Sequence, residues 1–332
     1  MSMSMSMSMS SSSSSSLSNP PTLTLRNGLK HPVIGFGTYK VGVIPASASS
    51  AVASGGPNAV ERTAEECVSD ALDVGYRFIE CAQFYANESE VGKAIAKSGV
   101  ERTDLFICSK VWTTTIEQGP QAIEEQLKKT LADLGTDYVD LYLIHWPVPG
   151  KHVEAYKTLE KLADQGKIKG IGVSNYAWED YLELKENGVK NLPLVNQIEI
   201  NPFLYRKNTI AKFADEGVVL QSYRSLRDGK AFDDPTILKI AESHGRSAAQ
   251  ILGRWCVQKG FVYIPKSVKK ERMVENSKVF DFELTEAEMN ELDSLTTPDA
   301  IETFVSLYRK CVNRDTSKDG TLDGVKMTIT GD

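Results

Sequence analysis

Four side chains that can donate, accept or stabilise protons follow successive apolar stretches of the chain. Glu80 and Tyr85 lie in FIECAQFY (78–85), while Lys110 ends LFICSK and His145 ends YVDLYLIH. A carboxylate buried without a partner is costly, so Glu80 requires a nearby cation such as Lys110. Carboxylate, phenol, ammonium and imidazole groups also serve in general acid–base catalysis. The spacing therefore predicts one cluster of titratable groups, provided that the fold brings these stretches together.

Each of the four residues also has a simpler structural explanation. Glu80 could be a solvated residue at the rim of a sheet, and Lys110 a solvated surface charge. His145 could be a hydrogen-bonded core histidine, and Tyr85 a packing residue. Their occurrence in chain order, each at or just after the end of an apolar stretch, favours the cluster over four separate explanations.

The elements that must position these groups alternate between short apolar runs and amphipathic stretches. Runs rich in β-branched and aromatic residues predict strands, and their lack of strict alternation is typical of parallel strands buried on both faces. The predicted strands are 33–37, 76–82, 105–110, 138–145, 168–175, 194–201, 218–225 and 261–267. Such βα units in succession predict an α/β fold, a (β/α)8 TIM barrel whose active site lies at the carboxyl ends of the strands.

Helical periodicity fills the intervals between the predicted strands. Ile123, Leu127, Leu131 and Leu134 recur at helical spacing, and Gly135 is a candidate C-cap. The predicted helices include 64–74, 123–135, 154–166, 209–217, 236–245 and 248–260.

Two shorter signals bear on the topology. Asn27-Gly28 precedes the first predicted strand and indicates a type I′ β-hairpin, which could close the bottom of the barrel. The alternative fold is an open doubly wound sheet, which usually carries GxGxxG after an early strand. The chain has only GFG at 35–37 and GIG at 170–172, so the barrel is favoured.

Composition narrows the possible partners and compartments. The chain has 332 residues, a formal net charge of −6 and no long basic run, which argues against nucleic-acid binding. No apolar run is long enough for a membrane helix, and no cluster of metal-ligating residues follows the strands. The 5 cysteines contain no CxxC pair and are expected to be reduced thiols in the cytoplasm.

The sequence predicts one barrel flanked by two tails. Residues 1–20 form a low-complexity Met/Ser tail that is expected to be disordered, and 313–332 a loosely held C-terminal tail. The barrel is expected over 21–312, with a flexible insertion at 41–62 on the active-site face. This insertion could cover a ligand or be a tolerated extension.

Several quoted motifs together resemble the aldo-keto reductase family. They span residues from about 22 to about 295 and include GFGTYK, GYRFIECAQFYANESEVGKAI, LFICSKVW, LGTDYVDLYLIHWP, GIGVSN, VNQIEINP and IPKSVKKERMVEN. The resemblance implies hydride transfer from NADPH to an aldehyde or ketone, with NADP+ as the product.

The resemblance assigns catalytic roles to the cluster. It implies that Tyr85 is the general acid, that Lys110 lowers the pKa of Tyr85, and that His145 orients the carbonyl oxygen. The family normally has an aspartate where this chain has Glu80, so the geometry of the fourth member is in question. Glu80 is nevertheless expected to pair with Lys110.

The resemblance also implies a complete cofactor site. Gly37 and Thr38 would lie near the nicotinamide, Tyr223 would stack on its ring, and the carboxamide would be bound by Ser174, Asn175 and Gln197. The 2′-phosphate and adenine would be bound by Lys266, Ser267, Arg272, Glu275 and Asn276. The alternative for KSVKKER is a solvated basic patch that starts a helix.

One segment departs from the family pattern. RSLRDG follows Tyr223 where the family usually has SPLG, so Arg224 and Arg227 could pair with the cofactor pyrophosphate or simply be exposed. The resemblance places substrate between Tyr39, Trp112 and Trp146, although Trp112 alone could be a packing residue.

The sequence therefore predicts a monomeric NADPH-dependent reductase of small carbonyl compounds. A non-catalytic NADPH-binding redox sensor of the same fold is the alternative, and Glu80 is the one residue that favours it. A metal-dependent hydrolase on another barrel is a third possibility that the strand ends do not support.

Overall fold

The computed structural model describes residues 17, 20–42, 62–302 and 305. Within them, an 8-stranded parallel sheet runs in the order β10-β9-β8-β7-β6-β5-β4-β3. A parallel bridge between Ile34 and Tyr263 joins its two edges, so the sheet closes into a barrel. The strands are β3 (Phe36–Gly37), β4 (Phe78–Glu80), β5 (Phe106–Val111), β6 (Val139–Ile144), β7 (Ile168–Ser174), β8 (Val195–Glu199), β9 (Val219–Tyr223) and β10 (Val262–Tyr263). The predicted (β/α)8 barrel is confirmed. Each barrel strand lies inside a predicted run except β5, which extends one residue beyond its run, to Val111.

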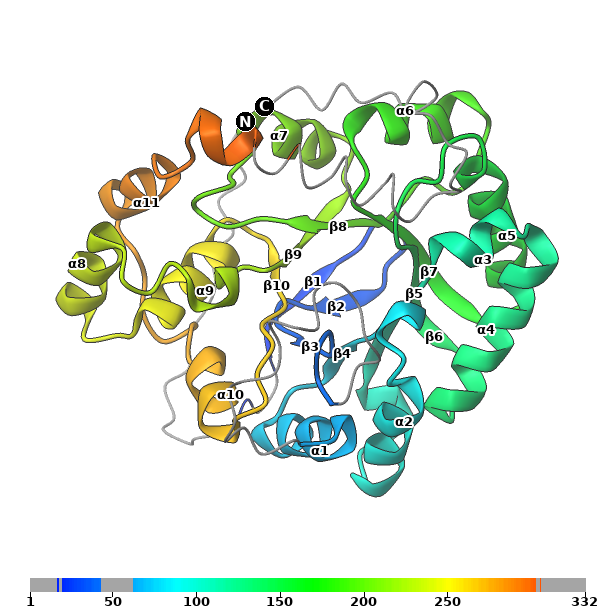
Figure 1. Cartoon of the computed structure of the whole chain (residues 1–332), viewed down its shortest axis with the longest axis horizontal. Helices are drawn as coiled ribbons and strands as arrows, with labels where there is room; N and C mark the ends of the chain where they lie inside the picture. The colour runs from blue at the N-terminus through cyan, green and yellow to red at the C-terminus, as the bar shows by residue number, and fades with distance from the viewer. Residues whose placement is uncertain (1–16, 18–19, 43–61, 303–304, 306–332) are drawn as a thin grey trace.

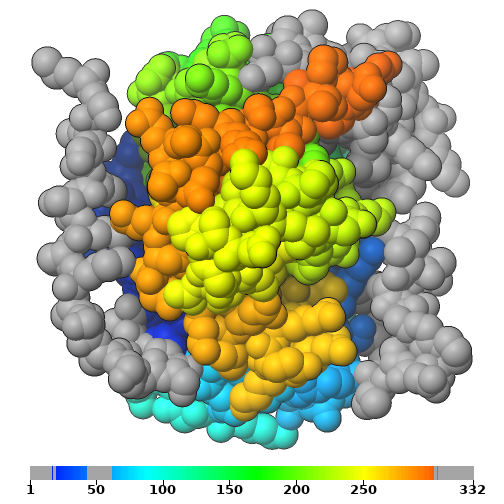
Figure 2. All heavy atoms as spheres, turned by 90° about the vertical axis from the view of Figure 1, so that its left-hand side faces the viewer, coloured from blue at the N-terminus to red at the C-terminus, as the bar shows by residue number. Residues whose placement is uncertain are grey.

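Helices surround the barrel (Figure 1), because the strands are apolar on their outer face as well as inside. The helices are α1 (Ala64–Val74), α2 (Glu88–Lys97), α3 (Thr113–Glu117), α4 (Pro120–Leu134), α5 (His152–Asp164), α6 (Trp178–Glu186), α7 (Lys207–Asp215), α8 (Pro235–His244), α9 (Ala248–Gln258), α10 (Lys270–Ser277) and α11 (Glu286–Asp293). Short 3-10 turns are η2 (Gln83–Tyr85), η3 (Arg102–Asp104) and η4 (Arg227–Gly229). Seen from the side, the yellow-to-orange segments that include α8 to α11 form one continuous outer surface (Figure 2).

Local sequence signals set the ends of several helices. Thr63 and Glu66 form a capping box at the start of α1, and Gly75 ends that helix with φ 108°. Gly135 ends α4 with φ 64°, so the predicted C-cap is confirmed. These caps satisfy backbone groups that a helix leaves unpaired at its ends.

The N-terminal hairpin is present, but its turn differs from the prediction. β1 (Thr22–Thr24) pairs antiparallel with β2 (Lys30–Pro32), and the Leu25 amide donates to Leu29 O at 2.9 Å. A type I′ turn needs two consecutive positive φ angles, whereas here Gly28 alone has one, at 88°. The predicted turn type is wrong, because the loop is five residues long and Gly28 ends its inner turn.

The hairpin covers the amino-terminal end of the barrel. Leu25 is 2 % exposed and packs in one interior cluster with side chains from several strands, including Phe78, Phe106, Leu141, Val195 and Val262. Arg26 donates to Pro193 O at 2.7 Å and to Glu216 O at 2.8 Å, and Asn27 donates to Lys169 O at 3.1 Å. These bonds hold the hairpin on the strand ends, as predicted for a base plug.

Several sequence predictions fall wholly or mostly outside the described residues. The tails 1–20 and 313–332 and the insertion 41–62 lie outside them, apart from residues 17, 20, 41, 42 and 62. In the described part, no helix is both long and apolar enough to cross a bilayer. The same part has no group of three or more residues arranged to hold a metal ion. Cys67, Cys81, Cys108 and Cys256 are buried free thiols.

Candidate active site

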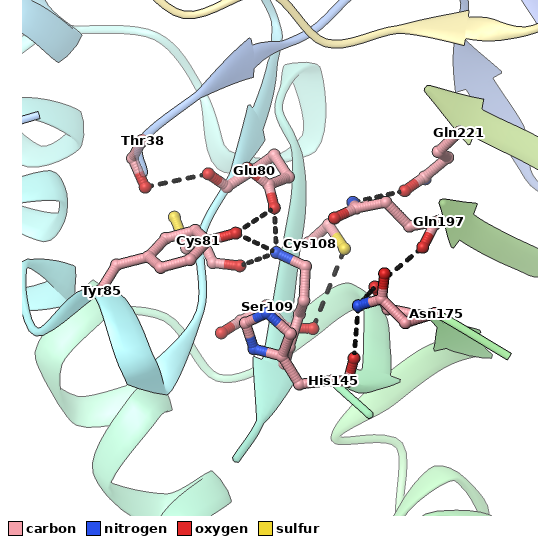
Figure 3. A network of polar contacts seen from close by, with 12 residues as sticks. Thr38, Glu80, Cys81, Tyr85, Cys108, Ser109, His145, Asn175, Gln197 and Gln221 are labelled. Carbon is pink, nitrogen blue, oxygen red and sulfur yellow. Dashed lines mark hydrogen bonds and ion pairs between the residues drawn. The ribbon is translucent and has the colours of Figure 1, made fainter. Parts of the chain in front are cut away.

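Strand register brings the predicted catalytic residues to one mouth of the barrel. Glu80 on β4 pairs with Cys108 on β5, and Lys110, two residues further, faces the same side because strand side chains alternate. Lys110 in turn pairs with Leu143 on β6, which places His145 on the same interior face just beyond that strand. Figure 3 shows Glu80, Tyr85, Cys108 and His145 around one centre.

Lys110 is the centre of the polar network. Its side chain is fully buried, and its Nζ forms an ion pair with Glu80 Oε1. The same Nζ donates to Tyr85 Oη and to Cys81 O, both at 2.9 Å. Pairing of this kind removes the cost that either isolated charge would have in the interior. The longer Glu80 side chain thus still reaches the lysine.

Backbone geometry places Tyr85 beside this pair. The turn η2 follows β4 directly, and Ala86 ends it with φ 56°. Thr38 fixes the strand end, since its amide and its hydroxyl donate to Glu80 O at 3.0 and 2.9 Å. Consequently Tyr85 is only 7 % exposed and its ring lies under Lys110 Nζ, 4.6 Å from the ring centroid.

The electrostatic environment of Tyr85 differs from the expectation. Its hydroxyl donates to Glu80 Oε1 at 3.1 Å while accepting from Lys110. Burial, followed by the charge of Glu80, raises the pKa of Tyr85 well above its usual value. The predicted lowering of this pKa by Lys110 is wrong for this state, because a carboxylate at the same hydroxyl favours the protonated phenol.

His145 is a buried neutral histidine at the same mouth. It is 8 % exposed, and burial together with the Lys110 charge lowers its pKa well below the usual value. Its ring packs edge-on to Tyr85, with centroids 5.8 Å apart. Within the described residues its Nδ1 has no hydrogen-bond partner, which is unusual for a buried polar atom.

Aromatic rings line this mouth. Tyr39 lies 5.1 Å from Tyr85 between ring centroids, and Trp112 lies 4.8 Å from His145. Phe84 stacks on Trp112 at 3.9 Å and was missed by the sequence analysis, although it directly precedes Tyr85. Trp146 follows His145 in the chain and is half-buried.

The residues expected to bind the carboxamide form a connected group. Asn175 adopts φ 59° and its Nδ2 donates to His145 O at 3.0 Å, while its Oδ1 accepts from Tyr223 Oη at 2.7 Å. Ser174 donates to Gln197 O at 2.8 Å. Gln197 pairs in register with Ser174 on one side and Gln221 on the other, so its amide belongs to the interior face of the mouth.

The residues expected to bind the 2′-phosphate and the adenine lie just before α10 and along that helix. Lys266 and Arg272 are exposed cations, whereas Ser267 and Asn276 are buried. Glu275 is half-buried on the same helix. Two exposed cations near buried polar groups are suited to an anionic ligand.

In the loop after β9, both arginines contact other side chains. Arg224 pairs with Glu199 at 3.0 Å and with Asp228 at 3.2 Å, so two carboxylates already neutralise it. Arg227 stacks over Phe203 with its guanidinium carbon 4.5 Å from the ring centroid. The sequence analysis missed Glu199, a buried carboxylate two residues beyond Gln197 that could have been identified by its position at a strand end.

Comparison with known proteins identifies close relatives. Residues 34–297 match the profile of the Aldo/keto reductase family. The glyoxal reductase of Bacillus subtilis (strain 168) is 39% identical over 281 residues, which cover 84% of this chain and 94% of that protein.

Solved structures agree with this match. An aldo/keto reductase from Brucella melitensis has 37% identity and a TM-score of 0.72, covering 83% of this chain and 100% of that one. An aldo-keto reductase of Bombyx mori in complex with NADP has 29% identity and a TM-score of 0.72, covering 83% and 93% respectively.

Proposed function

The chain belongs to the aldo/keto reductase family, and we propose that it reduces small aldehydes and ketones to alcohols with NADPH. The observation that carries this proposal is the buried group of Tyr85, Lys110, Glu80 and His145 at one mouth of the barrel. A phenol, a cation and a neutral imidazole together can protonate and stabilise a carbonyl oxygen as charge develops on it.

The residues present fit a phosphorylated dinucleotide. At Gly37, a Cβ would lie 3.3 Å from Ile264 Cγ2 and 3.4 Å from Glu80 Oε2, so the backbone at the end of β3 lies close to both residues with no side chain of its own. Asn175, Gln197 and Tyr223 offer amide and phenol groups there, and Lys266 and Arg272 offer exposed cations at α10. When bound, this cofactor supplies the hydride. The relative of known structure from Bombyx mori was solved with NADP, which supports the choice.

In the proposed reaction, Tyr85 donates its hydroxyl proton to the carbonyl oxygen. A developing alkoxide is a stronger base than an ordinary phenolate, which favours this transfer. The raised pKa of Tyr85 keeps its hydroxyl protonated near pH 7. Lys110 stabilises the phenolate that remains, since its Nζ already donates to Tyr85 Oη at 2.9 Å. Glu80 keeps Lys110 in place and balances its charge.

His145 and the aromatic rings would orient the substrate. A neutral imidazole can donate one N–H to the carbonyl oxygen, and the unpartnered Nδ1 marks His145 as a residue that gains a partner on binding. Tyr39, Trp112 and Trp146 would contact the substrate, together with Phe84. The glyoxal reductase relative makes dicarbonyls a natural first choice of substrate.

For the pyrophosphate we propose Arg227 and, after release from its carboxylates, Arg224. Both lie on the loop after β9, beside Tyr223. Because Arg224 is paired with Glu199 and Asp228, Arg227→Ala should weaken NADPH binding more than Arg224→Ala.

We also propose that the protein acts as a monomer in the cytoplasm.

One observation favours the alternative of an NADPH-binding redox sensor. The Glu80 carboxylate accepts a hydrogen bond from the Tyr85 hydroxyl, whose proton catalysis needs. A sensor would bind NADPH and turn over no substrate.

Loss of NADPH absorbance distinguishes the two functions. Purified protein is assayed with aldehydes, ketones and dicarbonyls, with NADPH or NADH. Turnover that prefers NADPH supports the reductase. Tight NADPH binding with no turnover on any substrate supports the sensor, and absence of NADPH binding contradicts both.

A further inference from the structure

A chain of buried side chains connects the base of the barrel to its mouth. His31 lies on β2 of the hairpin, Gln221 on β9 and Gln197 on β8. The His31 Nε2 lies 2.7 Å from Gln221 Nε2, and Gln197 Nε2 donates to Gln221 Oε1 at 2.9 Å. All three side chains are at most 2 % exposed. Neither His31 nor Gln221 takes part in the proposed reaction.

The surroundings of His31 fix its protonation and tautomer. Burial lowers its pKa to about 4, so the ring is neutral near pH 7. Its Nδ1 faces Pro32 O at 2.7 Å, and a carbonyl oxygen only accepts, so Nδ1 must carry the hydrogen. Nε2 therefore has a lone pair and can only accept.

This tautomer sets the direction of both amides. Gln221 must present its NH2 to His31 Nε2, which leaves its Oε1 facing Gln197. Gln197 must then present its own NH2 to Gln221, and its Oε1 points away from that contact. Figure 3 shows Gln221 and Gln197 joined in this way, with Asn175 next to Gln197. Register supports the arrangement, because Gln197 and Gln221 are paired on adjacent strands.

We propose that His31 and Gln221 are positioning residues for the nicotinamide end of the cofactor, because together they fix which end of the Gln197 amide faces the carboxamide. This inference rests on the proposed function, in which Gln197 binds that carboxamide. A glutamine amide that is free to rotate can exchange its acceptor for its donor by a half-turn, whereas a carboxamide needs one defined pattern. Pre-orientation of the Gln197 amide removes that ambiguity before binding.

The test separates the two ends of the cofactor. His31→Leu removes the acceptor, His31→Gln keeps an acceptor at this position, and Leu25→Val alters packing at the same base without touching the polar chain. Dissociation constants are measured for NADPH and for adenosine 2′,5′-bisphosphate, which has the 2′-phosphate but no nicotinamide. Thermal unfolding identifies variants that do not fold, and Gln221→Met then replaces His31→Leu.

In His31→Leu or Gln221→Met, the NADPH dissociation constant should rise by about 2- to 10-fold, the effect of one misdirected hydrogen bond. The constant for adenosine 2′,5′-bisphosphate should stay unchanged in both variants. His31→Gln and Leu25→Val should bind both ligands as the wild type does.

An unchanged NADPH constant in both test variants would overturn the inference, as would an equal rise for both ligands. An equal effect of Leu25→Val would also overturn it, since packing alone would then account for the change. If the wild-type protein binds adenosine 2′,5′-bisphosphate and NADPH equally well, the contact between Gln197 and the nicotinamide adds nothing to NADPH affinity, and the inference fails. If it binds neither, the proposed function itself fails.

Discussion

Two buried histidines lie at opposite ends of the same barrel and differ in how their ring nitrogens are used. At the base, His31 contacts Pro32 O through Nδ1 and Gln221 through Nε2. At the mouth, His145 Nδ1 has no partner among the described residues. Burial lowers the pKa of both, so both are neutral. At the base both ring nitrogens of the histidine have partners, whereas at the mouth one ring nitrogen is buried without a partner among the described residues.

The largest expected difference between the two histidines is in activity, when each is replaced by glutamine. His145→Gln should lower kcat/KM by about 10²- to 10³-fold, because it removes a positioned donor to the carbonyl oxygen. His31→Gln should change kcat/KM by less than about 3-fold, since its side chain can still accept from Gln221. Steady-state kinetics with NADPH and one active aldehyde measure both. Similar losses in the two variants would contradict the division between base and mouth.

The stability of the fold at low pH should depend on His31 at the base of the barrel. The pKa of His31 is about 4 in the folded chain, below the ordinary 6.5, so the unfolded state binds more protons between these values. The contribution of neutral His31 to the free energy of unfolding is therefore fully present above about pH 6.5. It is lost as the pH falls toward 4, and the loss is on the order of 3 kcal/mol.

Urea unfolding of the wild type and His31→Gln at pH 7 and pH 5 measures this contribution. His31→Gln should lose less stability than the wild type over the same interval, because glutamine does not titrate. Equal losses would show that His31 is already protonated or that its burial is not retained in solution.

Replacement of each histidine by leucine should change the free energy of unfolding by different amounts. His31→Leu should reduce the free energy of unfolding at pH 7 by about 1–3 kcal/mol, because Gln221 and Pro32 lose a partner in the interior. His145→Leu should change it by less than about 0.5 kcal/mol or stabilise the fold, since an unpaired polar atom is removed. Denaturant unfolding gives both values. A larger loss at His145 would show that this residue has a structural partner.

The smallest effect is expected at Glu80. Glu80→Asp should keep kcat/KM within about 3-fold at pH 7, because the charge beside Lys110 remains. It should also lower the pKa of the high-pH limb of the rate profile, since the shorter side chain withdraws from the Tyr85 hydroxyl. A pH–rate profile measures both. A fall of 10-fold or more would mean that the site depends on the longer carboxylate.

The sequence was most informative where a local pattern determines the structure. Apolar runs predicted the barrel strands, and motif order placed Glu80, Tyr85, Lys110 and His145 at one mouth because parallel strand ends share one edge. The turn at Asn27-Gly28 was mispredicted, since the loop length depends on where β1 and β2 begin to pair.

The contact between the hairpin and β9 could not be predicted. Gln221 and His31 are 190 residues apart and meet only because the hairpin closes the barrel base. The same holds for the pKa of Tyr85, whose direction depends on whether Glu80 reaches the hydroxyl as well as Lys110. Such a difference of one hydrogen bond is set by side-chain geometry, not by residue type.

In the proposed reaction, Tyr85 protonates a carbonyl compound during NADPH oxidation. The most direct measurement compares wild type and Tyr85→Phe in single-turnover absorbance traces at saturating NADPH, with NADPH binding measured separately. In Tyr85→Phe the rate should fall by at least about 10²-fold, with unchanged NADPH affinity. Equal rates in the two proteins would contradict it and would assign the proton to another group.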